Sequence, residues 1–219
     1  MEAERSVWMP TALLEEVDLG LPRGIESTLR GLRTPARIQN FINRIPWNYQ
    51  ENGHTARSVL GVLEHNVAHC IEAAFVGAAA LALAGHPPLL MDMGAARGDV
   101  DHVVVLFRRR GLWGAISKSN SPLLRYRDPI HRSLRELSIS FFPQYVKGRR
   151  KTLRTYSLPV DLRKHDSALW VTRPGECCTE MVEILTTVRH FPIVPADLEA
   201  DLRPIDKIEE RSSLMAEHD

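Results

Sequence analysis

The chain has 219 residues, of which 44% are hydrophobic, so it is long enough to form one domain with a full hydrophobic core and some appendages. Lysine and arginine (28) nearly balance aspartate and glutamate (27), which leaves no overall positive field to attract a nucleic acid or an anionic membrane. The basic runs at 107–111 and 147–151 are short, and we interpret them as solvated loops.

Cysteine usage indicates a reducing compartment, and the length of the apolar stretches does not indicate a membrane span. Three cysteines, of which Cys177 and Cys178 are adjacent, do not suit a disulfide framework. The first residues lack the features of a signal peptide, and the longest apolar stretch, 71–84, is shorter than the roughly 20 residues that span a bilayer. We therefore expect a cytoplasmic protein with free thiols and no membrane partner.

The N-terminal third is expected to be helical after an initial arm. Residues 1–33 are interpreted as this arm, with a short helix around 11–17 and loops at 20–24. An amphipathic helix is predicted from Thr34, which caps it, with Pro35 at the first helical position. A second helix is predicted at 55–65, capped by Thr55.

The segment from Cys70 to residue 84 is rich in alanine, glycine and leucine, which predicts a buried central helix. Gly85 is expected to end it as a left-handed cap, with two prolines beyond. The small side chains allow neighbouring elements to approach the helix backbone closely. Glu72, one turn into this apolar helix, needs a basic residue or backbone amides as partners if it is buried.

The pattern then changes to short runs typical of strands. Strands are predicted at 89–93, 102–107 and 112–117, the last two joined as an antiparallel hairpin. Asp128 and Pro129 are expected to begin another helix, and the remainder contains a predicted strand at 152–158, an apolar run at 168–171, a helix at 176–188 and a polar tail. The predicted class is α+β, with a central buried helix packed on an antiparallel sheet and a C-terminal extension.

Cys70 stands at the start of the predicted central helix, where a thiol can become acidic. The partial positive charge of a helix N-terminus favours a thiolate, and so does a nearby imidazolium. The first influence follows from the position of Cys70, and the second has to come from elsewhere in the fold. His102, at the start of a predicted strand, is the candidate base.

The expected hairpin also indicates a partner for His102. If residues 109–110 form a two-residue turn, Ser117 lies directly opposite His102, whereas a three-residue loop would put Lys118 there. A serine hydroxyl accepts a hydrogen bond from an imidazole without adding a charge. It therefore stabilises an imidazolium less than a carboxylate does.

Three segments together resemble the core of the transglutaminase-like superfamily, relatives of the papain-like thiol enzymes. They are TPARIQNFINRIPWNYQ (34–50), SVLGVLEHNVAHCIEAAFVGAAALALAGHPPLL (58–90) and DHVVVLFRRRGLWGAIS (101–117). In that superfamily a cysteine begins the central helix, a histidine opens a strand, and an aspartate follows a tryptophan on the next strand. The resemblance, which extends to a bacterial branch of the superfamily, implies that Cys70 is the nucleophile and His102 the base.

The chain is expected to have three parts. These are an N-terminal arm at 1–33, a core at 34–128 that contains the transglutaminase-like resemblance, and a C-terminal extension of helices and strands at 129–219 that packs on the core.

One position departs from the pattern of the superfamily. Four residues after Trp113, where that pattern has aspartate, this chain has Ser117. Three residues stay open as the group that supports His102. The hairpin register favours Ser117, Asp128 is the nearest carboxylate downstream, and Asn120 carries an amide of the kind that orients the imidazole in papain-like enzymes.

The implied reaction is acyl transfer on a peptide or another amide-containing substrate. The thiolate attacks a carbonyl, His102 protonates the leaving group, and backbone N–H groups at the helix start hold the oxyanion. The first interpretation is therefore a peptidase, an amidase or a transglutaminase-like enzyme that uses no metal or other cofactor and has no nucleic-acid partner. The oligomeric state stays open.

Two other interpretations are kept beside this one. The neutral Ser117 is compatible with an inactive scaffold or binding protein that retains the fold. His65 and His69 stand four residues apart next to Cys70, as zinc ligands on one helix face would. Because the segment that holds them spans a predicted break between two helices, a single face is not expected there, and a small zinc protein is the third interpretation.

Overall fold

Five antiparallel strands form the central sheet of the computed structural model, which describes residues 17–51 and 53–217. Along the sheet the strands follow the order β4, β3, β2, β1, β8, and two strand pairs, β5 with β6 and β7 with β9, lie outside it. The strands are β1 (Leu89–Met93), β2 (His102–Arg109), β3 (Leu112–Ile116), β4 (Arg127–His131), β5 (Val146–Lys147), β6 (Arg150–Lys151), β7 (Thr155–Ser157), β8 (Val160–Asp161) and β9 (His190–Pro192).

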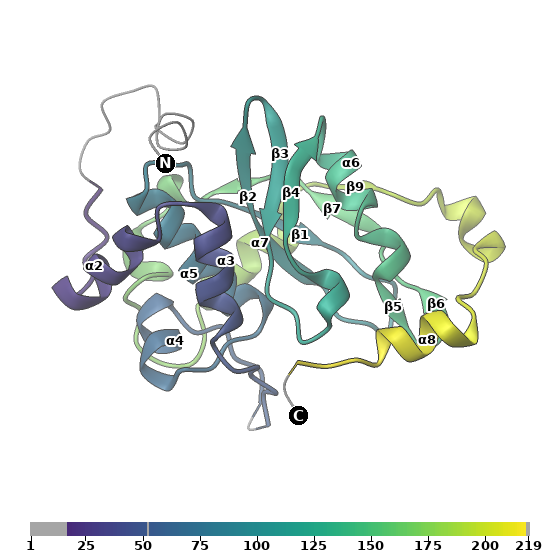
Figure 1. Ribbon diagram of the computed structural model, residues 1–219, viewed down its shortest axis with the longest axis horizontal. Coiled ribbons are helices and arrows are strands. Elements are labelled where there is room, and N and C mark those ends of the chain that lie inside the picture. The colour runs from purple at the N-terminus through teal and green to yellow at the C-terminus, as the bar shows by residue number, and fades with distance from the viewer. Residues whose placement is uncertain (1–16, 52, 218–219) are drawn as a thin grey trace.

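Helices lie on both sides of this sheet. In the view of Figure 1, α2 to α5 gather on one side and α6 and α8 on the other. The described helices are α2 (Arg23–Leu32), α3 (Pro35–Asn43), α4 (Val59–His65), α5 (Cys70–Leu83), α6 (Leu134–Ile139), α7 (Thr179–Thr187) and α8 (Lys207–Ser213). The protein is thus of the α+β class with an antiparallel sheet.

The two faces of the sheet belong to two hydrophobic cores because side chains alternate along each strand. On β2, Val103 and Val105 pack in the core that contains α5, whereas Val104 and Leu106 pack in a second core with Leu137 of α6. Both faces are apolar, so the sheet is buried between two layers.

Helix α5 is the buried centre of the first core, as its composition predicts. Every residue from Ile71 to Leu83 is buried. The helix ends before Gly85, which has a φ of 84°, and the prediction of its end is confirmed. At Gly77 a Cβ would lie 3.1 Å from Val105 of β2 and 3.2 Å from Ile42 of α3, so the missing side chain allows α5 to approach both elements.

Helices α3 and α4 begin at capping residues, but only one of the two expected caps is confirmed. The Thr34 hydroxyl accepts the Arg37 backbone N–H at 3.3 Å and starts α3 as predicted. The prediction of Thr55 as the cap of α4 is wrong, because Ser58 caps this helix and accepts the Gly61 N–H at 3.3 Å. Thr55 instead donates its hydroxyl to Glu72.

The β2–β3 hairpin is confirmed, with a different register. Arg109 pairs with Leu112, and the turn residues are Arg110 and Gly111, with φ values of 50° and 81°. Positive φ at both positions is typical of a type I′ turn. The turn therefore lies one residue later than predicted, and Ser117 is not directly opposite His102. The register is shifted by an even number of residues, so Ser117 stays on the same face of the sheet as His102.

The predicted helix start at Asp128 and Pro129 is wrong. Both residues lie in β4, an edge strand that pairs with β3, and Asp128 is exposed. An edge strand tolerates proline because one side of its backbone needs no partner in the sheet. The next helix, α6, begins later, where the Ser133 hydroxyl accepts the Glu136 N–H at 3.1 Å.

The terminal regions are more closely joined to the sheet and its helices than expected. Within the predicted arm, α2 packs its buried Leu29 into the first core. The predicted helix at 11–17 lies, except for Val17, outside the described residues. In the predicted C-terminal extension, β8 pairs with β1 and completes the five-stranded sheet, and α8 occupies part of the expected polar tail.

The close approach of α5 to its neighbours leads to a stability prediction. Gly77→Leu should lower the free energy of unfolding by about 1–3 kcal/mol, because the new side chain has no space against Val105 and Ile42. The measurement is urea denaturation. Gly31→Leu is the matched control, because Gly31 lies in α2 with no atom within 4 Å of its Cβ position and should give no loss. Equal stability of both variants would contradict the packing described here.

Candidate active site

Cys70 is the first residue of α5 and is only partly buried. The preceding helix ends at Asn66, whose φ of 51° turns the chain, and His69 is extended immediately before α5. Glu72 accepts the His69 backbone N–H at 3.0 Å, which fixes the start of the helix. The thiol therefore lies at the positive end of a helix of 14 residues, where a thiolate is favoured.

His102, the first residue of β2, is buried, and Ser117 holds its ring. The distance from His102 Nε2 to Ser117 Oγ is 2.7 Å. Ser117 Oγ also donates to the Leu124 carbonyl at 2.7 Å. Because the single hydroxyl proton is used in that second bond, Nε2 carries the proton of the first and Nδ1 is left for another partner.

The other partner of His102 is the thiol. The imidazole of His102 helps to lower the pKa of Cys70, and Nδ1 is the ring nitrogen that Ser117 leaves available to the thiol. The predicted contact of Ser117 with His102 is thus present, although the predicted register was wrong. A diagonal position on the neighbouring strand is still within reach of a long side chain such as histidine.

Gln39 of α3 holds the backbone of Ser117. Its amide oxygen accepts the Ser117 N–H at 2.9 Å, and its amide nitrogen donates to the Ser117 carbonyl at 2.8 Å. Both residues are buried. The segment after β3 contains Leu124, whose carbonyl accepts the Ser117 hydroxyl. The ion pair of Arg125 with Glu217 connects this segment to the end of the described chain.

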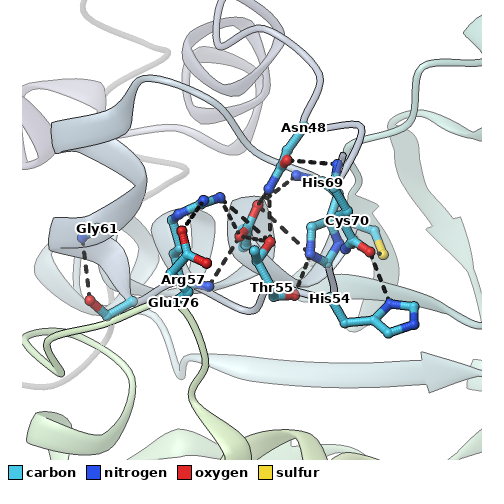
Figure 2. A network of polar contacts seen from close by, with 11 residues as sticks. Asn48, His54, Thr55, Arg57, Gly61, His69, Cys70 and Glu176 are labelled. Carbon is cyan, nitrogen blue, oxygen red and sulfur yellow. Dashed lines mark hydrogen bonds and ion pairs between the residues drawn. The ribbon is translucent and has the colours of Figure 1, made fainter. Parts of the chain in front are cut away.

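A second imidazole reaches the thiol from the residue before the helix. His69 Nδ1 lies 3.8 Å from Cys70 Sγ, and His69 Nε2 lies 2.8 Å from the Thr55 carbonyl. Figure 2 shows His69 next to Cys70, with its ring between the thiol and the loop of Thr55. From the sequence, His69 is a candidate only as a zinc ligand, and its contact with the thiol is not predicted, because adjacency in sequence does not show where a side chain points.

These contacts make the thiol acidic. Burial by itself raises the pKa of Cys70, but the hydrogen bonds and charges of His102 and His69 outweigh it and hold the pKa well below the usual value for a thiol. Burial likewise acts to lower the pKa of His69, whereas its contacts with Cys70 and Glu72 raise it, and the pKa of His69 is raised overall. By contrast, burial raises the pKa of Cys178 to about 12.

Glu72 is fully buried and has the partners that the sequence analysis required (Figure 2). Its Oε1 accepts the Thr55 hydroxyl at 2.7 Å and lies 3.3 Å from Arg57 Nη1. Its Oε2 accepts the Asn48 amide at 2.9 Å and lies 3.7 Å from His69 Nε2. Burial raises its pKa, but the charge of His69 and these hydrogen bonds lower it overall.

The two other candidates for the partner of His102 are engaged elsewhere or exposed. The Asn120 side chain donates to the Tyr49 hydroxyl at 3.0 Å and accepts the Glu217 N–H at 3.1 Å. Asp128 is exposed on β4, the edge strand. Lys118, which a three-residue loop would have placed opposite His102, is buried and donates to the Ile45 carbonyl.

The zinc interpretation finds no support in the geometry. His65 ends α4 and is exposed, whereas His69 lies in the break before α5 and is buried. Among residues 17–51 and 53–217, no group of three or more histidine, cysteine, aspartate or glutamate side chains is arranged to hold a metal ion.

A second histidine–carboxylate pair lies near the site and was not expected. His190 Nε2 is 3.1 Å from Oδ2 of Asp92, which is buried on β1. Burial raises the pKa of Asp92 to about 6. The sequence offers no signal for this pair, because 98 residues separate its members.

In comparisons with known proteins, no family model matches the chain, and no curated protein shows significant similarity to it. In the part of the chain that the structure describes, none of the helices is both long and apolar enough to cross a membrane.

The hydrogen bonds of Glu72 lead to a prediction for stability. Glu72→Gln should lower the free energy of unfolding at neutral pH by about 3 kcal/mol, because it removes the charge that balances Arg57 and His69 in a buried network. Since the folded state lowers the pKa of Glu72, the wild-type advantage should be complete above the ordinary glutamate pKa of about 4 and shrink as the pH falls below it.

Urea denaturation at about pH 7 and at about pH 3 measures both parts of this prediction. Glu64→Gln on the exposed surface of α4 is the control and should change the free energy of unfolding by less than about 0.5 kcal/mol. A Glu72→Gln effect that is small, or that is equally large in acid, would contradict the proposed role of the charge.

Proposed function

We propose that the protein is a cysteine-dependent acyl-transfer enzyme with a transglutaminase-like or papain-like core, acting as a peptidase, an amidase or a transglutaminase. One observation carries this proposal. The thiol of Cys70 lies at the N-terminus of a buried helix, His102 helps to lower its pKa, and Ser117 lies 2.7 Å from Nε2 of His102. A nucleophile, a base and a group that orients the base are the parts that thiol catalysis requires.

The proposed reaction begins with attack of the Cys70 thiolate on an amide or ester carbonyl. A bond forms between Sγ and the carbonyl carbon, and the π electrons move to the oxygen. Backbone N–H groups in the first turn of α5, which have no partner within the helix, are suited to stabilise this oxyanion. When the intermediate collapses, the bond to the leaving group breaks, and the leaving group takes a proton from His102.

The second half of the proposed reaction releases the acyl group. Water or an amine attacks the thioester while His102 accepts its proton, and the Cys70 thiolate leaves. Ser117 is a positioning residue in this scheme, since it fixes which ring nitrogen of His102 faces the sulfur.

The second candidate function is that of a binding or scaffold protein which retains this fold without turnover. The observation that favours it is the neutral hydroxyl of Ser117 behind His102. A hydroxyl orients an imidazole but does not balance its positive charge as a carboxylate does.

The reactivity of the cysteines provides the first test. At about pH 6, iodoacetamide should alkylate Cys70 at least tenfold faster than Cys177, because His102 and His69 hold the pKa of Cys70 well below the usual value for a thiol. Peptide mass spectrometry over time measures the rate at each cysteine. Cys178 should react slowest, since it is buried and burial raises its pKa. Equal slow labelling of all three cysteines would refute an activated thiol.

Acyl transfer itself is tested with p-nitrophenyl acetate as the probe. The enzyme should release p-nitrophenolate in a burst, carry acetyl on Cys70, and continue to turn over, whereas Cys70→Ala should show none of these. Acetylation of Cys70 without further turnover would favour the scaffold.

The orienting hydroxyl can be tested in the same assay. Ser117→Ala should lower the steady-state rate about tenfold, which corresponds to the loss of one hydrogen bond of roughly 1.4 kcal/mol. Ser119→Ala is the matched control, because Ser119 is a neighbouring buried serine whose Oγ accepts the Ser121 N–H. An unchanged rate in Ser117→Ala would show that the hydroxyl does not position His102.

A further inference from the structure

Two imidazoles lower the pKa of the Cys70 thiol, but different groups stand behind them. His102 is held by the Ser117 hydroxyl, which is neutral. Behind His69 lies Glu72, a carboxylate 3.7 Å from Nε2 and completely buried. A negative charge therefore stands behind His69 but not behind His102.

The hydrogen bonds of His69 orient its ring toward the thiol. Nε2 has the Thr55 carbonyl at 2.8 Å, and since a carbonyl only accepts, Nε2 carries a proton. Nδ1 then faces Cys70 Sγ at 3.8 Å. If Nδ1 is also protonated, His69 is an imidazolium that donates to a thiolate.

The charges around Glu72 leave one negative charge to balance His69. Arg57 lies between two carboxylates, with Nη1 3.3 Å from Glu72 and Nη2 2.9 Å from Glu176. One guanidinium against two carboxylates leaves a net charge of −1 in this network. Arg57 and Thr55 lie on the Oε1 side of Glu72, whereas the Oε2 side faces His69.

We propose that His69, held as an imidazolium by Glu72, stabilises the thiolate of Cys70 and supplies the ionic support that Ser117 does not provide. This inference rests on the proposed function and adds a second imidazole with a different task. His102 moves protons to and from the reacting groups, whereas His69 keeps its proton and acts through its charge.

The raised pKa of His69 and the lowered pKa of Cys70 agree with this assignment. Other titratable groups face the two residues from the surrounding elements. Glu72 faces His69, whereas His102, Asp92 and Tyr145 interact with Cys70, and Arg57 acts through Glu72. After the thiol of Cys70 itself, the charge of the buried Glu72 contributes most to raising the pKa of His69.

The test compares His69→Gln with His102→Gln by iodoacetamide alkylation of Cys70 as a function of pH. A glutamine amide can donate to the Thr55 carbonyl but carries no charge. His69→Gln should shift the pH profile upward by about one unit or more, so that alkylation at about pH 6 is about tenfold slower than in the wild type. His54→Gln is the control and should change nothing, because His54 is exposed and contacts Gln50.

A rescue at high pH separates a charge effect from a structural one. At about pH 9, near the ordinary pKa of a thiol, His102 and the helix N-terminus still favour the thiolate in His69→Gln, so this variant should regain the wild-type alkylation rate and the turnover of p-nitrophenyl acetate. His102→Gln should regain alkylation but not turnover, because its proton carrier is missing. An unshifted profile in His69→Gln, or no recovery at high pH, would overturn the proposal.

Failure of the proposed role of His69 can be distinguished from failure of the proposed function. If wild-type Cys70 reacts no faster than Cys177, the proposed function fails first. If wild-type Cys70 reacts fast and His69→Gln matches it, only the role of His69 fails. Should His69→Gln not fold, ¹⁵N NMR of the wild-type imidazoles decides at about pH 7.5, where both nitrogens of His69 should be protonated and a neutral ring would overturn the proposal.

Discussion

The rest of the site depends on the hydrogen bonds that the buried carboxylate of Glu72 accepts. It lies in the first turn of α5, with no exposure to solvent, and it needs several donors because a buried charge without partners is costly. These donors come from the loop before α4 and from the residue before α5 itself. The same contacts that satisfy Glu72 therefore determine where α5 begins and place Cys70 at its first position.

The central sheet provides the second half of the site. His102 opens β2 and Ser117 follows β3, so the hairpin brings together two side chains from the end of the sheet that lies near the start of α5. Close packing at Gly77 holds α5 against β2. The position of the thiol relative to the imidazole thus depends on the packing of a helix on a sheet as well as on the polar contacts of Glu72.

The elements with strong local signals could be predicted from the sequence. Thr34 and Pro35 predicted the start of α3, and Gly85 predicted the end of α5, because caps and positive φ angles depend on a few adjacent residues. Thr55 shows the limit of such signals. It has the chemistry of a helix cap, but a carboxylate 17 residues away accepts its hydroxyl, and a contact of this kind is visible only in the folded chain.

The candidate site could also be predicted only in part. Residue types and order indicated Cys70 and His102, and alternation along the hairpin kept Ser117 on the correct face even though the turn was placed one residue too early. His69 and the pair of Asp92 with His190 were missed because nothing in their local sequence indicates the direction of their side chains.

The ion pair of Arg125 with Glu217 has a mechanical consequence. It spans 92 residues of sequence and ties the C-terminal segment to the loop that offers the Leu124 carbonyl to Ser117. The Leu124 carbonyl accepts the proton of the Ser117 hydroxyl, and this bond determines that Nε2 of His102 carries a proton. Glu217, near the end of the described chain, is thereby connected by a short series of contacts to a ring nitrogen of the buried His102.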